Sequence, residues 1–163
     1  MSKDESKNKA AKFVIPLKAK NVMATEVAVM NESESVKKAA EIMAQEGISA
    51  IIVTVEGKAI GIVTERDILK RIVAEDKNAR KTKLKEIMSS PLVTIEPNTD
   101  LEKAARLMFE KKIKNLPVVQ ENRLIGLINL KDICLLQPDI LKLLKETMET
   151  PKNIQKVLRY YII

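Results

Sequence analysis

The sequence contains no histidine and a single cysteine, Cys134. These absences exclude acid–base catalysis by histidine, zinc sites built from cysteine and histidine, and a disulfide within the chain. Cys134 lies in an apolar stretch, and we interpret it as a small core residue. The chain also lacks a paired-carboxylate motif, a metal-ligand cluster and a Gly-x-x-x-x-Gly-Lys phosphate loop. We therefore predict no enzyme activity, no catalytic residue, no metal site and no required cofactor.

Aromatic residues are also scarce, with two Tyr, two Phe and no Trp among 163 residues. Aliphatic side chains must therefore fill the core, and few rings are available to stack on nucleic-acid bases. The chain has no run of about 18 apolar residues that could span a membrane. The N-terminal residues also lack the apolar segment of a signal peptide. We expect a cytoplasmic protein without membrane association.

The net charge of +7 is distributed unevenly along the chain. Lysine and arginine are in excess in residues 1–20, in residues 70–85 and, less strongly, in residues 137–163. Basic segments can bind polyanions, although flanking lysines usually serve solubility alone. They raise one alternative function, which is weak nucleic-acid binding through the basic tail and linker. Such binding would fall steeply with salt and show little base preference.

The segment Gly61–Asp67 (Gly-Ile-Val-Thr-Glu-Arg-Asp) returns 65 positions later as Gly126–Asp132 (Gly-Leu-Ile-Asn-Leu-Lys-Asp). The two copies stay in register without a gap, so that Val22–Leu69 aligns with Ile87–Cys134. A period of this length indicates two small domains rather than a solenoid. Each copy alone is close to the size at which a single core is marginal. We therefore expect the copies to pack together pseudo-symmetrically.

Both copies are predicted to follow the order β-α-β-β-α, which gives an α+β fold. In the first copy, serines that can cap a helix precede apolar residues at helical spacing, and Gly47 ends the pattern. A β-branched run and a turn at Gly57 then predict a hairpin. The predicted elements are strand 27–30, helix 35–46, strands 48–55 and 59–63 and a helix from 64 to at least 72, and then strand 93–95, helix 100–111, strands 116–119 and 124–128 and a helix from 130.

These patterns divide the chain into five segments. We predict a disordered basic tail (1–12), a first repeat (13–72), a basic linker (73–85), a second repeat (86–136) and a C-terminal helical extension (137–163). Within the extension, residues 138–147 and 154–161 have helical patterns. Their apolar side chains need a partner, either in this chain or in another copy.

The repeated motif predicts a strand that ends directly at the start of a helix. Its glycine would allow another group to approach the backbone closely, and the amides of the first helical turn would favour an anion. Thr64 could donate to a phosphate or ribose oxygen, Asp67 could accept two ribose hydroxyls, and Arg66 and Lys131 could neutralise phosphate. The alternative is that Thr64-x-x-Asp67 and Asn129-x-x-Asp132 only cap their helices. On the motif alone, capping is the more common explanation.

The two copies resemble cystathionine-β-synthase (CBS) domains over about Ala19–Leu136. The resemblance depends on the openings Val22-Met23 and Ile87-Met88, on the amphipathic helix, on Ile113-Lys-Asn-Leu-Pro-Val-Val119 and on the ending Gly-h-h-[Ser/Thr]-x-x-Asp, where h is apolar. The second copy departs from that ending with Asn129, and the first copy has Ile52 at the usual proline position.

The resemblance implies a regulatory module that binds AMP, ADP, ATP or a related adenosine compound in two clefts between the copies. The first cleft would use Asp67, Thr64, Arg66, Ile62, Ser49, Met88, Val93, Ile113 and Lys114. The second would use Asp132, Asn129, Lys131, Leu127, Lys114, Met23, Ala28, Ile48 and Ser49. For the apolar members of both sets, a place in the core explains the pattern equally well.

The leading hypothesis is therefore a ligand-sensing regulatory module without catalysis. The resemblance further implies a homodimer or higher homo-oligomer and an unidentified protein that the module regulates. Because Asn129 lacks the hydroxyl of Thr64, we expect the first cleft to be the better site.

Overall fold

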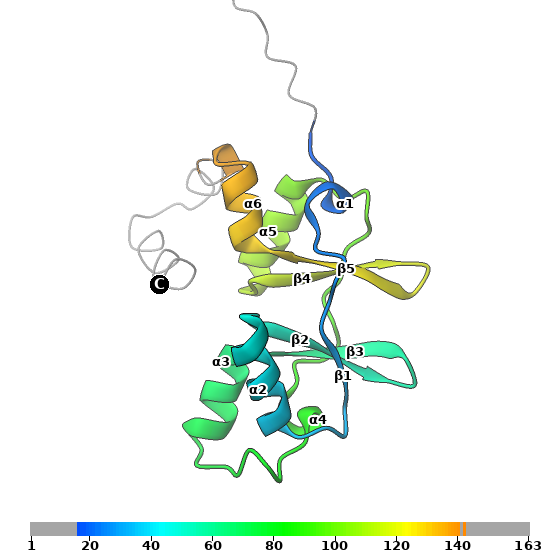
Figure 1. Ribbon diagram of the computed structural model, residues 1–163. Helices are drawn as coiled ribbons and strands as arrows, with labels where there is room; N and C mark the ends of the chain where they lie inside the picture. The colour runs from blue at the N-terminus through cyan, green and yellow to red at the C-terminus, as the bar shows by residue number, and fades with distance from the viewer. Residues whose placement is uncertain (1–15, 141, 143–163) are drawn as a thin grey trace, which may run out of the picture.

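The computed structural model describes residues 16–140 and residue 142. The predicted tail 1–12, the predicted helical segment 154–161 and residues 141 and 143–147 of the predicted helical segment 138–147 lie outside the described residues. The predicted α+β order is confirmed. Figure 1 shows two sheets next to each other at the centre, with helices above and below them.

The first repeat contains β1 (Val29–Asn31), α2 (Val36–Glu46), β2 (Ala50–Val55), β3 (Lys58–Thr64), α3 (Glu65–Ile68) and the π-helix η1 (Leu69–Val73). β1 pairs parallel to β2, and β2 pairs antiparallel to β3. The predicted second helix is present, but its C-terminal half has π-helical hydrogen bonding. A left-handed residue, Gly57, forms the hairpin turn as predicted.

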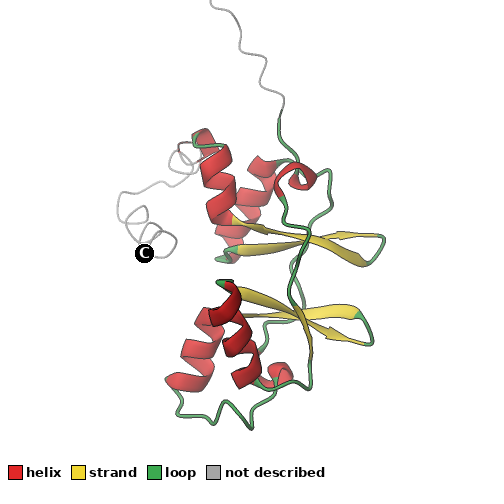
Figure 2. Cartoon of the chain, viewed as in Figure 1, coloured by secondary structure: helices red, strands yellow, loops and turns green. Residues whose placement is uncertain are grey.

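The second repeat contains α5 (Leu101–Lys111), β4 (Asn115–Gln120), β5 (Arg123–Asn129) and α6 (Leu130–Leu136). Its antiparallel hairpin has the same bulge position as the first repeat, since the shift at Val118 lies 65 positions after the shift at Val53. The predicted strand 93–95 is reduced to a single parallel bridge between Ile95 and Val118. Figure 2 shows the two hairpins side by side with the helices on the outer sides.

The helix α2 shows how the local sequence sets an element. The side chain of Ser35 accepts a hydrogen bond from the backbone amide of Lys38, which caps the N-terminus. At the C-terminus, Gly47 adopts the left-handed conformation with φ of 65°. The buried face lies between these ends and consists of Val36, Ala39 and Met43.

The short helices that precede each repeat pack against the core of the other repeat. Helix α1 (Ala19–Val22) contributes Ala19 to the core formed by α5, β4, β5 and α6. Helix α4 (Leu84–Ile87) contributes Leu84 and Ile87 to the core formed by α2, β2, β3 and η1. The predicted linker 73–85 therefore contains a fully buried residue, Leu84, just before its last residue. This exchange ties the two repeats into one unit.

The segments after α1 and α4 continue this exchange along the hairpins. Ala24 exchanges two backbone hydrogen bonds with Leu127 on β5, each 2.9 Å long, and Ser89 exchanges two with Ile62 on β3. A Cβ on Gly61 would lie 2.6 Å from Met88 Sδ, and one on Gly126 would lie 2.5 Å from Met23 Sδ. The prediction that these glycines permit a close approach is confirmed, but the approaching group is a methionine of the chain itself.

Candidate functional site

A cavity of about 500 Å³ lies between the two repeats. Cavities that hold small ligands have this size. Strand β3 and helices α3 and η1 form one wall, and the end of α5 with the start of β4 forms the other. The lining residues are Ser49, Ile62, Thr64, Glu65, Arg66, Asp67, Lys70, Arg71 and Ser89 on the first side, and Lys111, Lys112, Ile113, Lys114 and Asn115 on the second.

Seven of the nine residues predicted for the first cleft line this cavity. Met88 and Val93 are the two exceptions. Met88 packs over Gly61 and against the first core, and Val93 packs against the second core. The ligand-binding role of all nine residues stays a prediction, and the structure supplies their relative positions.

Thr64 and Asp67 form a reciprocal capping box at the start of α3. The Thr64 amide and hydroxyl both donate to Asp67 Oδ2, at 2.9 and 2.7 Å, and the Asp67 amide donates to Thr64 Oγ1 at 3.3 Å. The Asp67 side chain is 14% exposed, and its other oxygen, Oδ1, lies 3.5 Å from a terminal nitrogen of Arg71. Capping thus engages one carboxylate oxygen and leaves Oδ1 oriented toward a cation.

The first-turn amides of α3 are less available than the sequence predicts. The Glu65 amide donates to the Ser49 carbonyl at 3.1 Å, and the Asp67 amide is held by Thr64. Two amides of this turn are therefore engaged within the chain, and anion binding by the first helical turn stays a prediction. Basic side chains also line the cavity.

Several lining residues were not predicted from the sequence, and most of them are basic. Lys70 and Arg71 lie one turn after Arg66, and Lys111 and Lys112 directly precede Ile113. Arg71 is held in place because its guanidinium donates to the Ile87 carbonyl and lies 3.5 Å from Ser89 Oγ. The sequence signals for these residues were the basic excess in residues 70–85 and the lysines at the end of the helix predicted over 100–111.

The second predicted cleft has a different geometry. Asn129 accepts a hydrogen bond from the Lys131 amide at 2.8 Å and donates to Asn115 Oδ1 at 3.0 Å. Asp132 is exposed, whereas Asp67 is half-buried. Met23 packs over Gly126, and Ala28 and Ile48 pack against the first core. Of this set, the cavity described above includes only Ser49 and Lys114.

A second cavity of about 780 Å³ lies apart from the first, between Leu17, the start of α5 and residues 136–140. There Lys18 Nζ donates to Asp100 Oδ1 at 2.6 Å, and this hydrogen bond holds the pKa of Asp100 below its ordinary value. Burial raises the pKa of the Cys134 thiol.

Among the described residues, no group of three His, Cys, Asp or Glu side chains could hold a metal ion. No helix of this part of the chain is long and apolar enough to cross a membrane.

The fold and its inter-repeat cavity define a pair of repeated α+β domains with a cleft between them. The pattern of the CBS domain matches residues 19–74 and 84–145. The chain belongs to the CBS-domain family.

Relatives and solved structures agree with this assignment. The chain is 36% identical over 118 residues to the CBS domain-containing protein YhcV of Bacillus subtilis, covering 72% of this chain and 84% of YhcV. The matched part of the chain covers 51% to 65% of the length of three other relatives. It covers 22% to 23% of the length of three relatives that are named as enzymes.

Two solved structures illustrate the shared fold. A protein with CBS domains from Burkholderia ambifaria is 30% identical with a TM-score of 0.66, covering 71% of this chain and 84% of that one. The CBS domain pair of MJ0100, in complex with 5′-methylthioadenosine and S-adenosyl-L-methionine, is 24% identical with a TM-score of 0.69, covering 77% of this chain and 98% of that one. At this identity the second structure shows the common fold alone.

Proposed function

We propose that this chain is a regulatory module that binds an adenine nucleotide in the cavity lined by Thr64 and Asp67, and that it carries out no catalysis. The observation that supports the proposal is the position of Asp67, a half-buried carboxylate between the two repeats with one oxygen facing the cavity cations. The bound adenosine compounds of the MJ0100 domain pair give the same ligand class.

The chemistry of the cavity suits the three parts of a nucleotide. Asp67 Oδ1 can accept from the ribose hydroxyls, as carboxylates do in dinucleotide-binding folds. Ile62 and Ile113 are half-buried on opposite walls and offer apolar surface to adenine. The basic side chains at the ends of these walls can pair with phosphate.

A ligand in this position would contact both repeats at once. It would therefore favour the arrangement of the repeats that fits it best, and it could change a surface that another protein recognises. The last helix of each repeat exposes large apolar side chains, with Leu69 60%, Val73 65%, Leu135 69% and Leu136 54% exposed. We propose that these helices contribute to a homodimer or higher homo-oligomer.

The test is a thermal-shift screen of the chain with AMP, ADP, ATP, NAD, S-adenosylmethionine and short DNA, because a ligand that binds only the folded state raises its melting temperature. An adenine nucleotide should give the largest shift. The Asp67→Asn variant keeps a cap acceptor but loses the charge, so its nucleotide affinity should fall about tenfold or more. Asp132→Asn is the matched control and should retain most of the affinity.

Two results would contradict the proposal. One is an absence of any shift with adenosine compounds, and the other is an Asp67→Asn variant that binds as tightly as the parent chain. A shift with DNA alone would instead support the nucleic-acid alternative, which stays a prediction because the basic tail lies outside the described residues.

A further inference from the structure

The lining of the inter-repeat cavity is strongly and asymmetrically basic. Six cationic side chains line it, against the two carboxylates Glu65 and Asp67. The six are Arg66, Lys70 and Arg71 from the first repeat and Lys111, Lys112 and Lys114 from the second. They come from opposite walls, so a ligand between the repeats meets positive charge on both sides.

The internal repeat provides a control for this charge, because every position has a counterpart 65 residues away. The six counterparts are Lys131, Leu135, Leu136, Glu46, Gly47 and Ser49, in the same order. Only Arg66 has a basic counterpart. A lining built from the counterparts of all the cavity residues would hold two cations, which are Lys131 and, as the counterpart of Ser49, Lys114. These two would face the carboxylates Glu46 and Asp132. The fold alone therefore does not require the positive charge.

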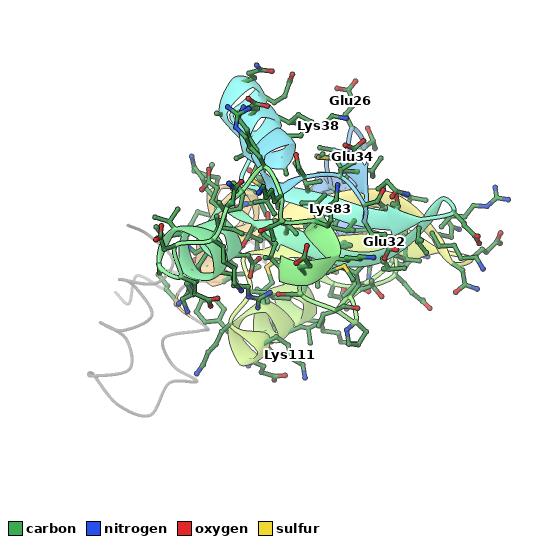
Figure 3. All side chains as sticks on the ribbon, turned by 90° about the horizontal axis from the view of Figure 1, so that it is seen from below. Glu26, Glu32, Glu34, Lys38, Lys83 and Lys111 are labelled. Carbon is green, nitrogen blue, oxygen red and sulfur yellow. The ribbon has the colours of Figure 1, made fainter. Side chains whose placement is uncertain are left out.

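Lys112 provides a second, independent observation. It is the C-cap of α5 and adopts the left-handed conformation with φ of 55°, where a side chain is unfavourable and glycine is the usual residue. The first repeat has Gly47 at this position, with φ of 65°. The second repeat thus has a lysine at a strained position that faces the cavity. Figure 3 labels the neighbouring Lys111 on the side of the molecule opposite Glu26 and Lys38.

Arg71 is already oriented for an anion. Its guanidinium is fixed by the Ile87 carbonyl and by the ion pair with Asp67 Oδ1. An arginine held in this way loses less side-chain freedom when it binds a ligand, and a guanidinium is a group that pairs well with phosphate.

We propose that this cavity selects a nucleoside polyphosphate, with two or more phosphates, over a nucleoside monophosphate or an uncharged or cationic adenosine compound. The inference rests on the proposed function for the position of the site, and it adds the ligand class and a stoichiometry of one per chain. Each added phosphate brings about one further negative charge into contact with the cations. The place lined by the counterpart residues, 65 positions away, has balanced charges of both signs and does not bind the polyphosphate.

The experiment is isothermal titration of the whole chain with adenosine, AMP, ADP, ATP and S-adenosylmethionine, at fixed ionic strength and without divalent cations. ADP and ATP should bind about tenfold or more tightly than AMP, one per chain, and the advantage should shrink as salt is added. S-adenosylmethionine should bind more weakly than AMP. Equal affinity for AMP and ATP, or two equivalent ATP sites, would overturn the inference.

Lys112→Gly separates binding from folding. Because it places the residue of the first repeat at a left-handed position, it should fold at least as stably as the parent chain. It should lose about three- to tenfold in ATP affinity and leave adenosine affinity unchanged. Lys111→Glu, which copies Glu46, should lose more. Lys58→Ala removes an exposed charge outside the cavity and is the matched control. An unchanged ATP affinity in both cavity variants would overturn the inference.

The outcomes also distinguish this inference from the proposed function. Tight AMP or adenosine binding that is lost in Asp67→Asn, with no gain from further phosphates, would overturn the polyphosphate inference and support the adenine-nucleotide site. Equal binding of GTP and ATP, both weakened by Lys112→Gly, would support polyphosphate selection and contradict adenine specificity. Inorganic tripolyphosphate is the probe for the cations alone and should compete with ATP.

Discussion

Replacement of Gly61 by alanine tests the packing that joins the two repeats. The new Cβ would lie 2.6 Å from Met88 Sδ, 3.0 Å from Met88 Cγ and 3.1 Å from the Ser89 carbonyl oxygen. Overpacking of this kind costs about 1–3 kcal/mol, because a side chain and the backbone must both shift. For a chain of this length, the melting temperature should fall by about 3–10 °C.

The cause can be isolated with a double-mutant cycle in urea. Met88→Ala alone should cost about 1–3 kcal/mol, since Met88 is only half-buried. Because Met88→Ala removes the closest clash, the double variant should cost about 1–2 kcal/mol less than the sum of the single variants. Gly57→Ala is the control, because Gly57 has φ of 76° and nothing within 4 Å of its Cβ position, so its cost should add to that of Met88→Ala. Additive costs for Gly61→Ala and Met88→Ala would refute the packing argument.

Three further predictions concern stability and reactivity. Ser35→Ala removes the N-cap of α2 and should lower the free energy of unfolding by about 0.5–2 kcal/mol in urea denaturation, and no loss would contradict the capping role. The pKa of Asp100 is lowered by Lys18, so the stability from this pair is present above its ordinary pKa of 3.8 and lost as pH falls through the folded value. Lys18→Met should flatten the acid dependence of the melting temperature, and an unchanged profile would contradict this pairing. Burial raises the pKa of Cys134, so iodoacetamide at pH 8 should modify it more slowly in the folded chain than in urea, and equal rates would contradict its burial.

Much of the fold could be predicted because the repeat shows each local pattern twice. The α2 helix, its Ser35 cap and its Gly47 stop follow from neighbouring residues, and the structure contains all three. The exchange of α1 and α4 between the repeats was not predictable in this way. It depends on contacts between distant segments, such as Ala24 with Leu127, for which hydrophobic spacing carries no signal. The same limit applies to Gly61, where the sequence indicated a close approach without showing what approaches.

The candidate site was predictable in part for similar reasons. Thr64 and Asp67 belong to a compact motif, and the structure places both on the cavity. Capping and ligand binding were competing interpretations of that motif, but the capping box uses only one oxygen of Asp67. The cations Lys111 and Lys112 were missed, because lysines at the end of an amphipathic helix are usually solvated. Their relation to Arg71 appears only when the second repeat is packed against the first.

A crystal structure of the chain grown with ATP would test the proposed binding site directly. We predict one nucleotide per chain between the repeats, with its ribose hydroxyls at Asp67 Oδ1 and its phosphates among Arg66, Arg71 and Lys112. A nucleotide bound only beside Asp132, or one that lies outside the inter-repeat cavity, would contradict it.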